Sequence, residues 1–202
     1  QDGANCKFST LLYEIAAIPG VERIRFTTSN PMDFTDDIIE AIKELPVISD
    51  QIHVPIQAGS DRILEAMHRR YTVAQYKKLV KKLRAARPSV HISSDFIVGF
   101  PGETKEDFEE TMKVVNEVEF DQSFSFVYSI RPGTPAALLE DPVSKETKME
   151  RLYILQNRLE ELAAKYTQRF IGSTQRVLVE GTSRKDENEL KSRSSCGRIV
   201  VF

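Results

Sequence analysis

The sequence predicts an α/β fold in which parallel strands alternate with helices. Four runs of residues alternate between apolar and polar side chains, and segments with helical periodicity lie between these runs. The runs begin about 30 to 40 residues apart, which is typical of βα units. Such units build a parallel sheet with right-handed crossovers.

The expected elements can be placed in chain order. Strands are expected at 22–29, 51–57, 90–98 and 122–131. Helices are expected at 9–18, 35–45, 60–70, 73–87 and 105–118. A Pro-rich loop, "RPGTPAALLEDPVS", follows the fourth strand.

A long amphipathic helix is expected next, from Lys145 to about Phe170, and Gly172 ends it. The remaining chain predicts a strand at 174–181, a loop at 182–197 and a strand at 198–202. Two strands are too few for an independent β domain, so the C-terminal unit is expected to be incomplete.

Composition limits the class of protein. The chain has 202 residues, of which 41% are hydrophobic, enough for one domain or one domain and a fraction. The sequence contains no run of about 18 apolar residues, the length needed to span a membrane, and its N-terminus shows no export signal. The two cysteines, Cys6 and Cys196, give no disulfide framework and no metal-binding pair. We expect a cytoplasmic chain that ligates no metal itself.

The charge is distributed unevenly. The whole chain has a formal net charge of -2, but residues 165–198 carry eight basic and four acidic residues. This asymmetry is compatible with nucleic-acid binding near the C-terminus, and equally with a solvated basic face.

The alternation in the four strands predicts one apolar and one polar face. The apolar face, expected to pack under the helices, contains Ile24, Phe26, Ile52, Val54, Ile56, Val90, Ile92, Phe96, Val98, Phe124, Phe126, Tyr128 and Ile130. The polar face contains Arg23, Arg25, Thr27, Ser29, His53, Gln57, His91, Ser93, Asp95, Ser123, Ser125, Ser129 and Arg131. Burying so many polar groups without partners would cost about 1–3 kcal/mol each. The polar face therefore lines either a ligand-holding lumen or the solvated side of the sheet.

The carboxyl ends of the strands are candidate ligand sites. "TTSNP", "PIQAGSD", "FIVGFPGE" and "SIRPGTP" all lie at such ends, where βα enzymes keep their chemistry. Gly59 and Gly99 could let the backbone approach a ligand or could only form turns. Gly102 is expected to turn the chain, and Thr104 to cap a helix with Asp107. His68 is expected to be a surface residue at a helix end.

Five motifs in order carry a family resemblance. They are "RIRFTTSNPMDFTDDIIEAI", "IHVPIQAGSDRILEAMHRRYT", "ISSDFIVGFPGETKEDFEETM", "SIRPGTPAALL" and "TQRVLVEGTSRK". Together they resemble the radical S-adenosylmethionine (SAM) methylthiotransferases, in the branch that modifies isopentenylated adenosine in tRNA. The resemblance covers almost the whole chain.

The resemblance implies a fold. Residues 1–171 would form the later βα units of a radical SAM partial barrel and its C-terminal helix. Residues 172–202 would begin a small RNA-binding β domain called TRAM. It also implies SAM as a cofactor and 4Fe-4S clusters in a longer parent protein, none of them ligated by this chain.

The resemblance also implies roles for particular residues. The cofactor-binding residues would be Gln57, Ser60, Asp95, Ile97, Gly99 and Arg131. Ile97 would offer adenine an apolar surface, and Arg131 would meet a carboxylate or a phosphate. RNA would contact Arg176, Arg184, Lys185, Arg193 and Arg198. No catalytic residue is identified.

The implied function is methylthiolation at C2 of N6-isopentenyladenosine beside the tRNA anticodon, by a monomeric enzyme. The alternatives are the branches that modify threonylcarbamoyl-adenosine or a ribosomal-protein aspartate, or a cluster-free RNA-binding protein. The family motifs differ at Asn30 and Ala58, where histidine and serine are usual. The family's CxxxCxxC motif is missing from these 202 residues, so the chain is expected to be a fragment that is inactive alone.

Overall fold

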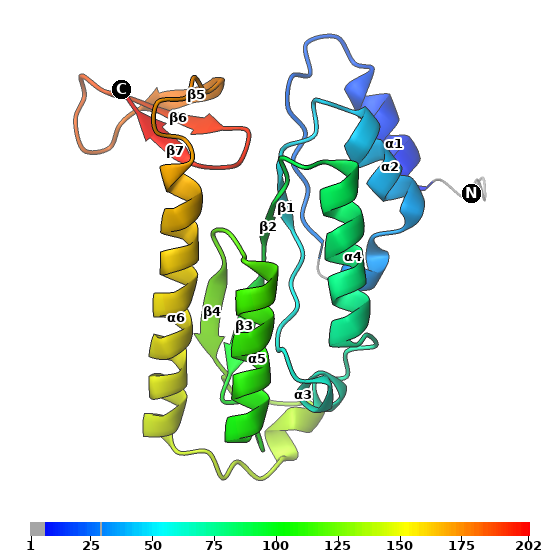
Figure 1. Ribbon diagram of the computed structural model, residues 1–202, viewed down its shortest axis with the longest axis vertical. Helices are drawn as coiled ribbons and strands as arrows, with labels where there is room; N and C mark the ends of the chain where they lie inside the picture. Colours follow the sequence, from blue (N-terminus) through cyan, green and yellow to red (C-terminus); the bar gives the residue numbers. More distant parts are fainter. Residues whose placement is uncertain (1–6, 29) are drawn as a thin grey trace.

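The computed structural model describes residues 7–28 and 30–202, and it has helices packed beside short parallel strands (Figure 1). Ser29 and Cys6 lie outside the described residues. The helices are α1 (Phe8–Ala16), α2 (Asp36–Glu44), α3 (Asp61–Ala66), α4 (Val73–Ala86), α5 (Lys105–Val118) and α6 (Lys145–Gln168). Two 3-10 helices, η1 and η2, lie at Pro31–Asp33 and Pro135–Leu138. The strands are β1 (Gln51–His53), β2 (His91–Ser93), β3 (Asp95–Val98), β4 (Phe124–Val127), β5 (Val177–Thr182), β6 (Leu190–Ser194) and β7 (Ile199–Val201).

Two parallel pairs form the strand layer. β1 pairs with β2, and β3 pairs with β4, in agreement with the predicted parallel α/β class. An isolated parallel bridge between Gln57 and Phe96 links the end of the β1 segment to β3. The predicted strand at 22–29 is only partly formed, because its backbone pairs at two points, Ile24 with Ile48 and Thr27 with His53.

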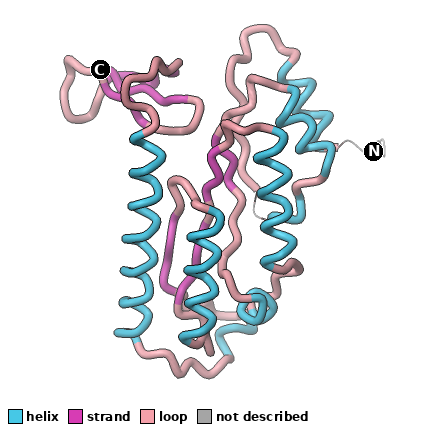
Figure 2. Tube along the Cα trace, viewed as in Figure 1, coloured by secondary structure: helices cyan, strands magenta, loops and turns pink. Residues whose placement is uncertain are grey.

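The helices cover one side of these strands, as Figure 2 shows. The core between them contains Ile52, Val54, Ile56, Phe96 and Val98, all of which are buried. These residues belong to the predicted apolar face. From α6 the core receives Leu155, Leu159 and Leu162, which lie on one side of that helix as its periodicity predicts.

The prediction for β4 was wrong. Phe124, Phe126 and Ile130 were expected under the helices, but they are 60%, 53% and 61% exposed. The parallel register explains this, because it pairs Phe124 with Asp95 and Phe126 with Ile97. Paired residues of neighbouring strands share a face, so these aromatic rings lie on the face that carries Asp95.

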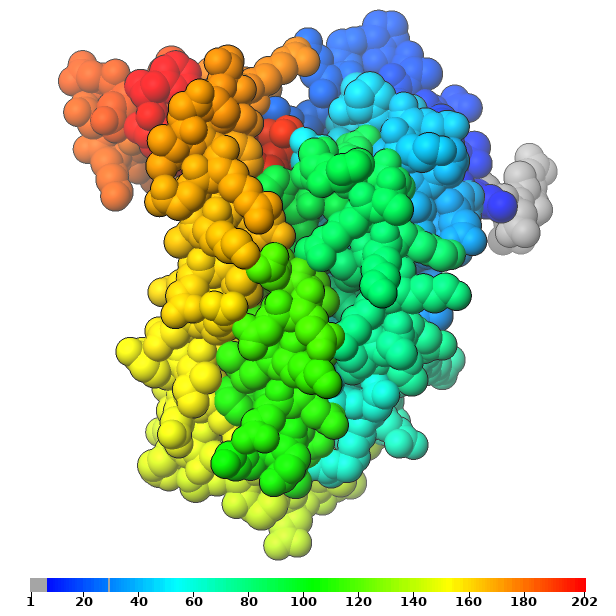
Figure 3. All heavy atoms as spheres, viewed as in Figure 1, coloured from blue at the N-terminus to red at the C-terminus, as the bar shows by residue number. Residues whose placement is uncertain are grey.

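The C-terminal prediction was wrong in one element. The expected loop at 182–197 contains β6, which forms the centre of a three-stranded antiparallel sheet with β5 and β7. Its inward residues, Ser192 and Ser194, are buried but not apolar, so hydrophobic alternation does not reveal the strand. This sheet lies at the end of α6 (Figure 3).

The start of α5 is tied to α3 by a buried carboxylate. Thr104 and Asp107 form the predicted capping box. Asp107 also accepts hydrogen bonds from Arg62 and, at 2.7 Å, from the hydroxyl of Ser60. Burial alone would raise the pKa of Asp107, but the bonds from Arg62 and Ser60 outweigh it and hold that pKa well below its usual range.

We predict that Asp107→Asn lowers the free energy of unfolding at pH 7 by about 1–3 kcal/mol, because the charged hydrogen bonds are lost. A lowered pKa in the folded state stabilises above the unfolded pKa of about 4, and this contribution disappears as the pH falls. The difference between variant and original should therefore shrink from pH 5 downward in urea unfolding. Glu109→Gln, which changes an exposed carboxylate of the same helix, is the control. A pH-independent difference would contradict this account.

Candidate functional site

The predicted polar face lines an open cavity, called here the lumen cavity, of about 700 Å³. Its lining residues are Arg25, Phe26, Thr27, Gln51, His53, Ser93, Asp95, Gln122, Phe124, Arg193 and Gly197. His53 Nδ1 lies 3.1 Å from the Ser93 hydroxyl, and His53 Nε2 lies 3.3 Å from Asp95 Oδ2. The polar groups of neighbouring strands therefore satisfy one another across this face.

A second cavity, the rim pocket, lies at the carboxyl ends of β3 and β4 and measures about 570 Å³. It brings together three of the predicted cofactor-binding residues, Gln57, Ile97 and Arg131. Asp95 lies two residues before Ile97 on the same face of β3, but it lines the lumen cavity. The remaining rim-pocket residues are Ala66, Met67, His68, Arg69, Phe100, Phe126, Val127, Tyr128, Ser129, Thr134, Pro135 and Ala136.

Gln57 is held in place by β3. Its N–H donates to the Asp95 carbonyl at 3.0 Å, and its carbonyl accepts from the N–H of Ile97 at 2.9 Å. Its φ of 73° lies in the left-handed region, which non-glycine residues seldom adopt. Such strain persists only where the surrounding structure enforces it, and it is common at functional sites.

Twelve rim-pocket residues were not predicted as site residues, and the reason can be identified for four of them: His68, Arg69, Phe126 and Tyr128. His68 and Arg69 were missed because the helix that corresponds to α3 was predicted to continue to residue 70. α3 ends at Ala66, and His68, with φ of 56°, turns the chain so that both His68 and Arg69 line the pocket. Phe126 and Tyr128 were missed because the sequence placed them on the face that packs under the helices.

Tyr128 has an unusual hydroxyl group. Among the buried side-chain atoms of the described residues, it is the one nitrogen or oxygen without a hydrogen-bond partner. Its ring packs edge-on against Phe100, with 5.0 Å between ring centroids. A buried polar group without a partner costs about 1–3 kcal/mol, which suggests that a ligand or solvent molecule completes its hydrogen bonding.

Ser60 and Gly99 do not join the rim pocket. The hydroxyl of Ser60 is buried and donates to Asp107, on the side of α5. Gly99 has φ of 67°, and a Cβ there would collide with the side chain of Lys148. Both residues therefore have structural roles in this chain, and their contact with a ligand stays a prediction.

The five predicted RNA-binding residues are dispersed. Arg198 is only 8% exposed, and its guanidinium donates to both carboxylate oxygens of Asp121 at 2.8 Å. Its guanidinium therefore has a partner within the protein, and its contact with RNA stays a prediction. Arg193 donates to Glu180 at 2.7 Å and lines the lumen cavity.

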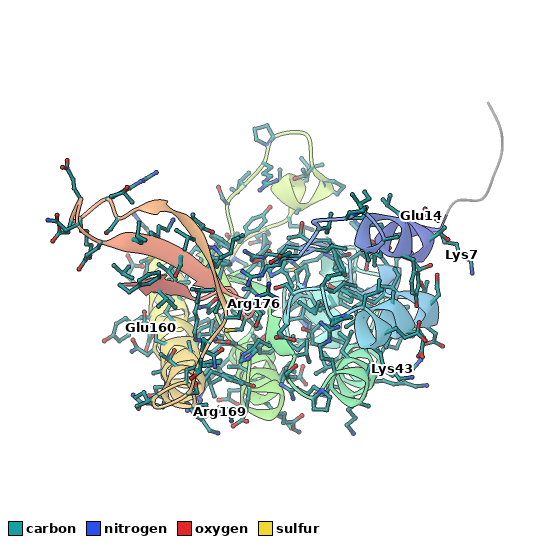
Figure 4. The ribbon with its side chains drawn as sticks, turned by 90° about the horizontal axis from the view of Figure 1, so that it is seen from above. Lys7, Glu14, Lys43, Glu160, Arg169 and Arg176 are labelled. Carbon is teal, nitrogen blue, oxygen red and sulfur yellow. The ribbon has the colours of Figure 1, made fainter. Side chains whose placement is uncertain are left out.

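The other three are exposed. Arg176, labelled in Figure 4, pairs with Glu22 at 2.6 Å. Arg184 and Lys185 lie in the loop between β5 and β6. Both are exposed, and neither forms an ion pair with a described residue.

Asp121 joins the C-terminal sheet to the strand layer. It accepts hydrogen bonds from Arg198 and lies 2.8 Å from His91 Nδ1. Burial alone would raise the pKa of Asp121, but the bonds with His91 and Arg198 hold it below its usual range. The Arg198 guanidinium also lies 4.9 Å from the ring centroid of Phe170.

Within residues 7–28 and 30–202, no group of three or more His, Cys, Asp or Glu side chains could hold a metal ion. No described helix combines the length and the apolar character needed to cross a membrane.

Comparison with known proteins gives one family. The sequence profile of the Radical SAM superfamily matches residues 6–115. A tRNA-2-methylthio-N(6)-dimethylallyladenosine synthase of Mannheimia succiniciproducens is 56% identical over all of this chain and 43% of its own length. The protein of the same name from Haemophilus influenzae is 54% identical, with the same coverage of both chains. The chain thus spans less than half the length of these relatives.

Two solved structures share the fold. Coproporphyrinogen III oxidase from Escherichia coli, a radical SAM enzyme, has a TM-score of 0.54 at 20% identity. The match covers 66% of this chain and 31% of that one. A radical SAM methyltransferase from Kitasatospora setae has a TM-score of 0.52 at 19% identity, covering 64% of this chain and 26% of that one.

We predict that Arg198→Ala lowers the free energy of unfolding by about 3–5 kcal/mol, because it leaves the buried Asp121 carboxylate without its cation. Arg184→Ala, which removes an exposed arginine of the same unit, should change that free energy by less than about 0.5 kcal/mol. Urea unfolding of the two variants measures both values. Equal stability would show that Arg198 does not fix the C-terminal sheet.

Proposed function

This chain belongs to the Radical SAM superfamily, and from that premise we propose that it is part of an enzyme that methylthiolates C2 of N6-isopentenyladenosine in tRNA. One observation of the structure carries the proposal. Gln57, Ile97 and Arg131 come from three separate motifs and meet in one cavity at the carboxyl ends of the strands. βα folds bind their ligands at this end of the sheet.

The rim pocket fits SAM by its chemistry. Ile97, Phe100 and Phe126 offer apolar surface for a purine, and Arg131 offers a cation for a carboxylate. The unpartnered hydroxyl of Tyr128 offers a further hydrogen bond. When bound, SAM would supply the radical that starts the reaction. This chain's residues would bind the nucleoside, orient it and exclude water.

The described residues do not fit a 4Fe-4S cluster. Cys196 is buried in the C-terminal sheet, where its sulfur lies 3.1 Å from the Ser194 hydroxyl. The chain has only one other cysteine, Cys6, whereas such a cluster needs at least three thiolates. We propose that other parts of a longer protein hold the clusters and that these 202 residues are inactive alone.

The finer fold assignment is also a proposal. Residues 1–171 would form the later part of a partial barrel, and residues 172–202 part of a TRAM-like RNA-binding unit. The antiparallel sheet of β5, β6 and β7 supports a separate C-terminal unit. Arg184 and Lys185 would contact phosphates around the anticodon stem-loop. The enzyme would act as a monomer in the cytoplasm, where tRNA is modified.

Mass spectrometry of tRNA nucleosides tests the proposed function. Deleting the gene that encodes this chain should remove 2-methylthio groups from N6-isopentenyladenosine and leave the unmodified nucleoside. The intact gene should restore the group, and a Gln57→Ala copy should restore less, because the pocket loses a polar contact worth about 1–3 kcal/mol. Loss of methylthio groups from threonylcarbamoyl-adenosine instead would favour the other tRNA branch.

Tyr128→Phe tests the fit of the rim pocket. In the ligand-free chain it should leave the melting temperature unchanged or raise it, because it removes an unpaired buried hydroxyl. The variant should bind SAM about threefold to tenfold more weakly than the original chain, as measured by calorimetry, because one hydrogen bond to the ligand is lost.

Tyr76→Phe is the matched control, because its buried hydroxyl donates to the Val54 carbonyl at 2.8 Å. It should lower stability by about 1 kcal/mol and leave the affinity unchanged. If Tyr128→Phe destabilises the ligand-free chain as much as Tyr76→Phe does, the Tyr128 hydroxyl has a structural partner and the fit fails.

A further inference from the structure

The rim pocket collects positive charge without a neighbouring carboxylate. Arg69 and Arg131 line it, and no Asp or Glu is among its described lining residues. Within the described part of the chain, neither Arg69 nor Arg131 forms an ion pair. Arginines elsewhere, such as Arg62 and Arg151, lie against buried carboxylates. The positive charge of this pocket is therefore not neutralised by a carboxylate of residues 7–28 or 30–202.

Local structure fixes both arginines at the pocket. The Arg69 N–H donates to the Leu64 carbonyl at 2.8 Å, directly after the left-handed turn at His68. The Arg131 carbonyl accepts from the hydroxyl of Thr134 at 2.8 Å and from its N–H at 3.2 Å. The two side chains come from different βα loops and face one cavity, so their convergence does not follow from neighbouring positions in the sequence.

The backbone at His68 adds an independent observation. A φ of 56° is unfavourable for a residue with a Cβ, and it is the conformation that ends α3 and turns Arg69 toward the pocket. Four non-glycine residues of the described chain have positive φ, and two of them, Gln57 and His68, line this pocket. Strain of this kind is usually retained where it positions functional groups.

We propose that Arg69 and Arg131 together form an oxyanion site at the rim pocket, which binds a carboxylate or a phosphate. Guanidinium groups bind both anions through paired hydrogen bonds. The inference rests on the proposed function, which supplies two such anions, the carboxylate of SAM and the phosphates of RNA. The sequence indicated Arg131 alone, whereas Arg69 and the pairing of the two come from the structure.

The test compares Arg69→Gln and Arg131→Gln with Arg70→Gln in the 202-residue chain. Arg70 is the matched control, because it is exposed, adjacent in sequence and not part of the pocket lining. Calorimetry measures the affinity for SAM and for 5′-deoxyadenosine, which lacks the carboxylate. Fluorescence anisotropy measures the affinity for an RNA anticodon stem-loop at several salt concentrations. Thermal melting checks that each variant folds.

If the anion is the carboxylate, both pocket variants should bind SAM about tenfold or more weakly and bind 5′-deoxyadenosine as before. If it is a phosphate, both should bind the RNA more weakly, and the log-log salt slope should decrease by about 0.7 for each variant. Arg70→Gln should match the original chain in either case.

Unchanged affinities for SAM and RNA in both folded pocket variants would overturn the oxyanion site. An equal loss in Arg70→Gln would also overturn it, because the effect would then be one of general surface charge. The two proposals fail separately: the proposed function fails if deleting the gene leaves the 2-methylthio groups in tRNA, whereas the oxyanion site fails if the unaltered chain binds neither SAM nor the RNA.

Discussion

The register between β3 and β4 is the constraint on which both cavities depend. It pairs Asp95 with Phe124 and Ile97 with Phe126, so one face of two strands carries a carboxylate, an aliphatic side chain and two aromatic rings. A one-residue shift of β4 against β3 would turn Phe124 and Phe126 toward the helices, and a one-residue shift of β3 would bring Phe96 and Val98 out of the core. The buried face holds this register, because Phe96 is fully enclosed between the strands and the helices.

Buried carboxylates in the packed interior are paired with arginines, whereas the arginines at the rim pocket lie against no carboxylate of the described residues. Asp107, Asp121 and Glu103 are buried carboxylates, and each lies against an arginine. These pairs join α3 to α5, the C-terminal sheet to the strand layer, and α6 to the turn after β3. Removing one partner of any of these pairs would leave a buried charge without its counter-ion, which strongly destabilises the folded state. The rim pocket instead leaves its arginines free of carboxylates, so its charge is available to a ligand.

The sequence predicted the α/β class, the helices and the family resemblance, and the structure and the comparisons confirm these points. It placed the buried faces of β1, β2 and β3 correctly, because apolar residues alternate there without ambiguity. β4 was misassigned because alternation alone does not say which face is buried when aromatic residues line a cavity. β6 was missed because serines fill its inward positions. Arg69 was missed because helical periodicity continues past Ala66, where a left-handed His68 ends the helix.

Residues of one strand, β3, line both cavities, and their order along the strand limits what each cavity can bind. Asp95 and Ile97 are two residues apart on the same face of β3, yet Asp95 faces His53 in the lumen cavity and Ile97 lies in the rim pocket. An anion held by Arg69 and Arg131 therefore stays away from the Asp95 carboxylate, which would repel it. A nucleoside whose purine lies on Ile97 could still reach Asp95 with a neutral hydroxyl group, which a carboxylate accepts from readily. The order of groups along β3 thus favours a ligand that is anionic at one end and neutral and hydroxylated at the other.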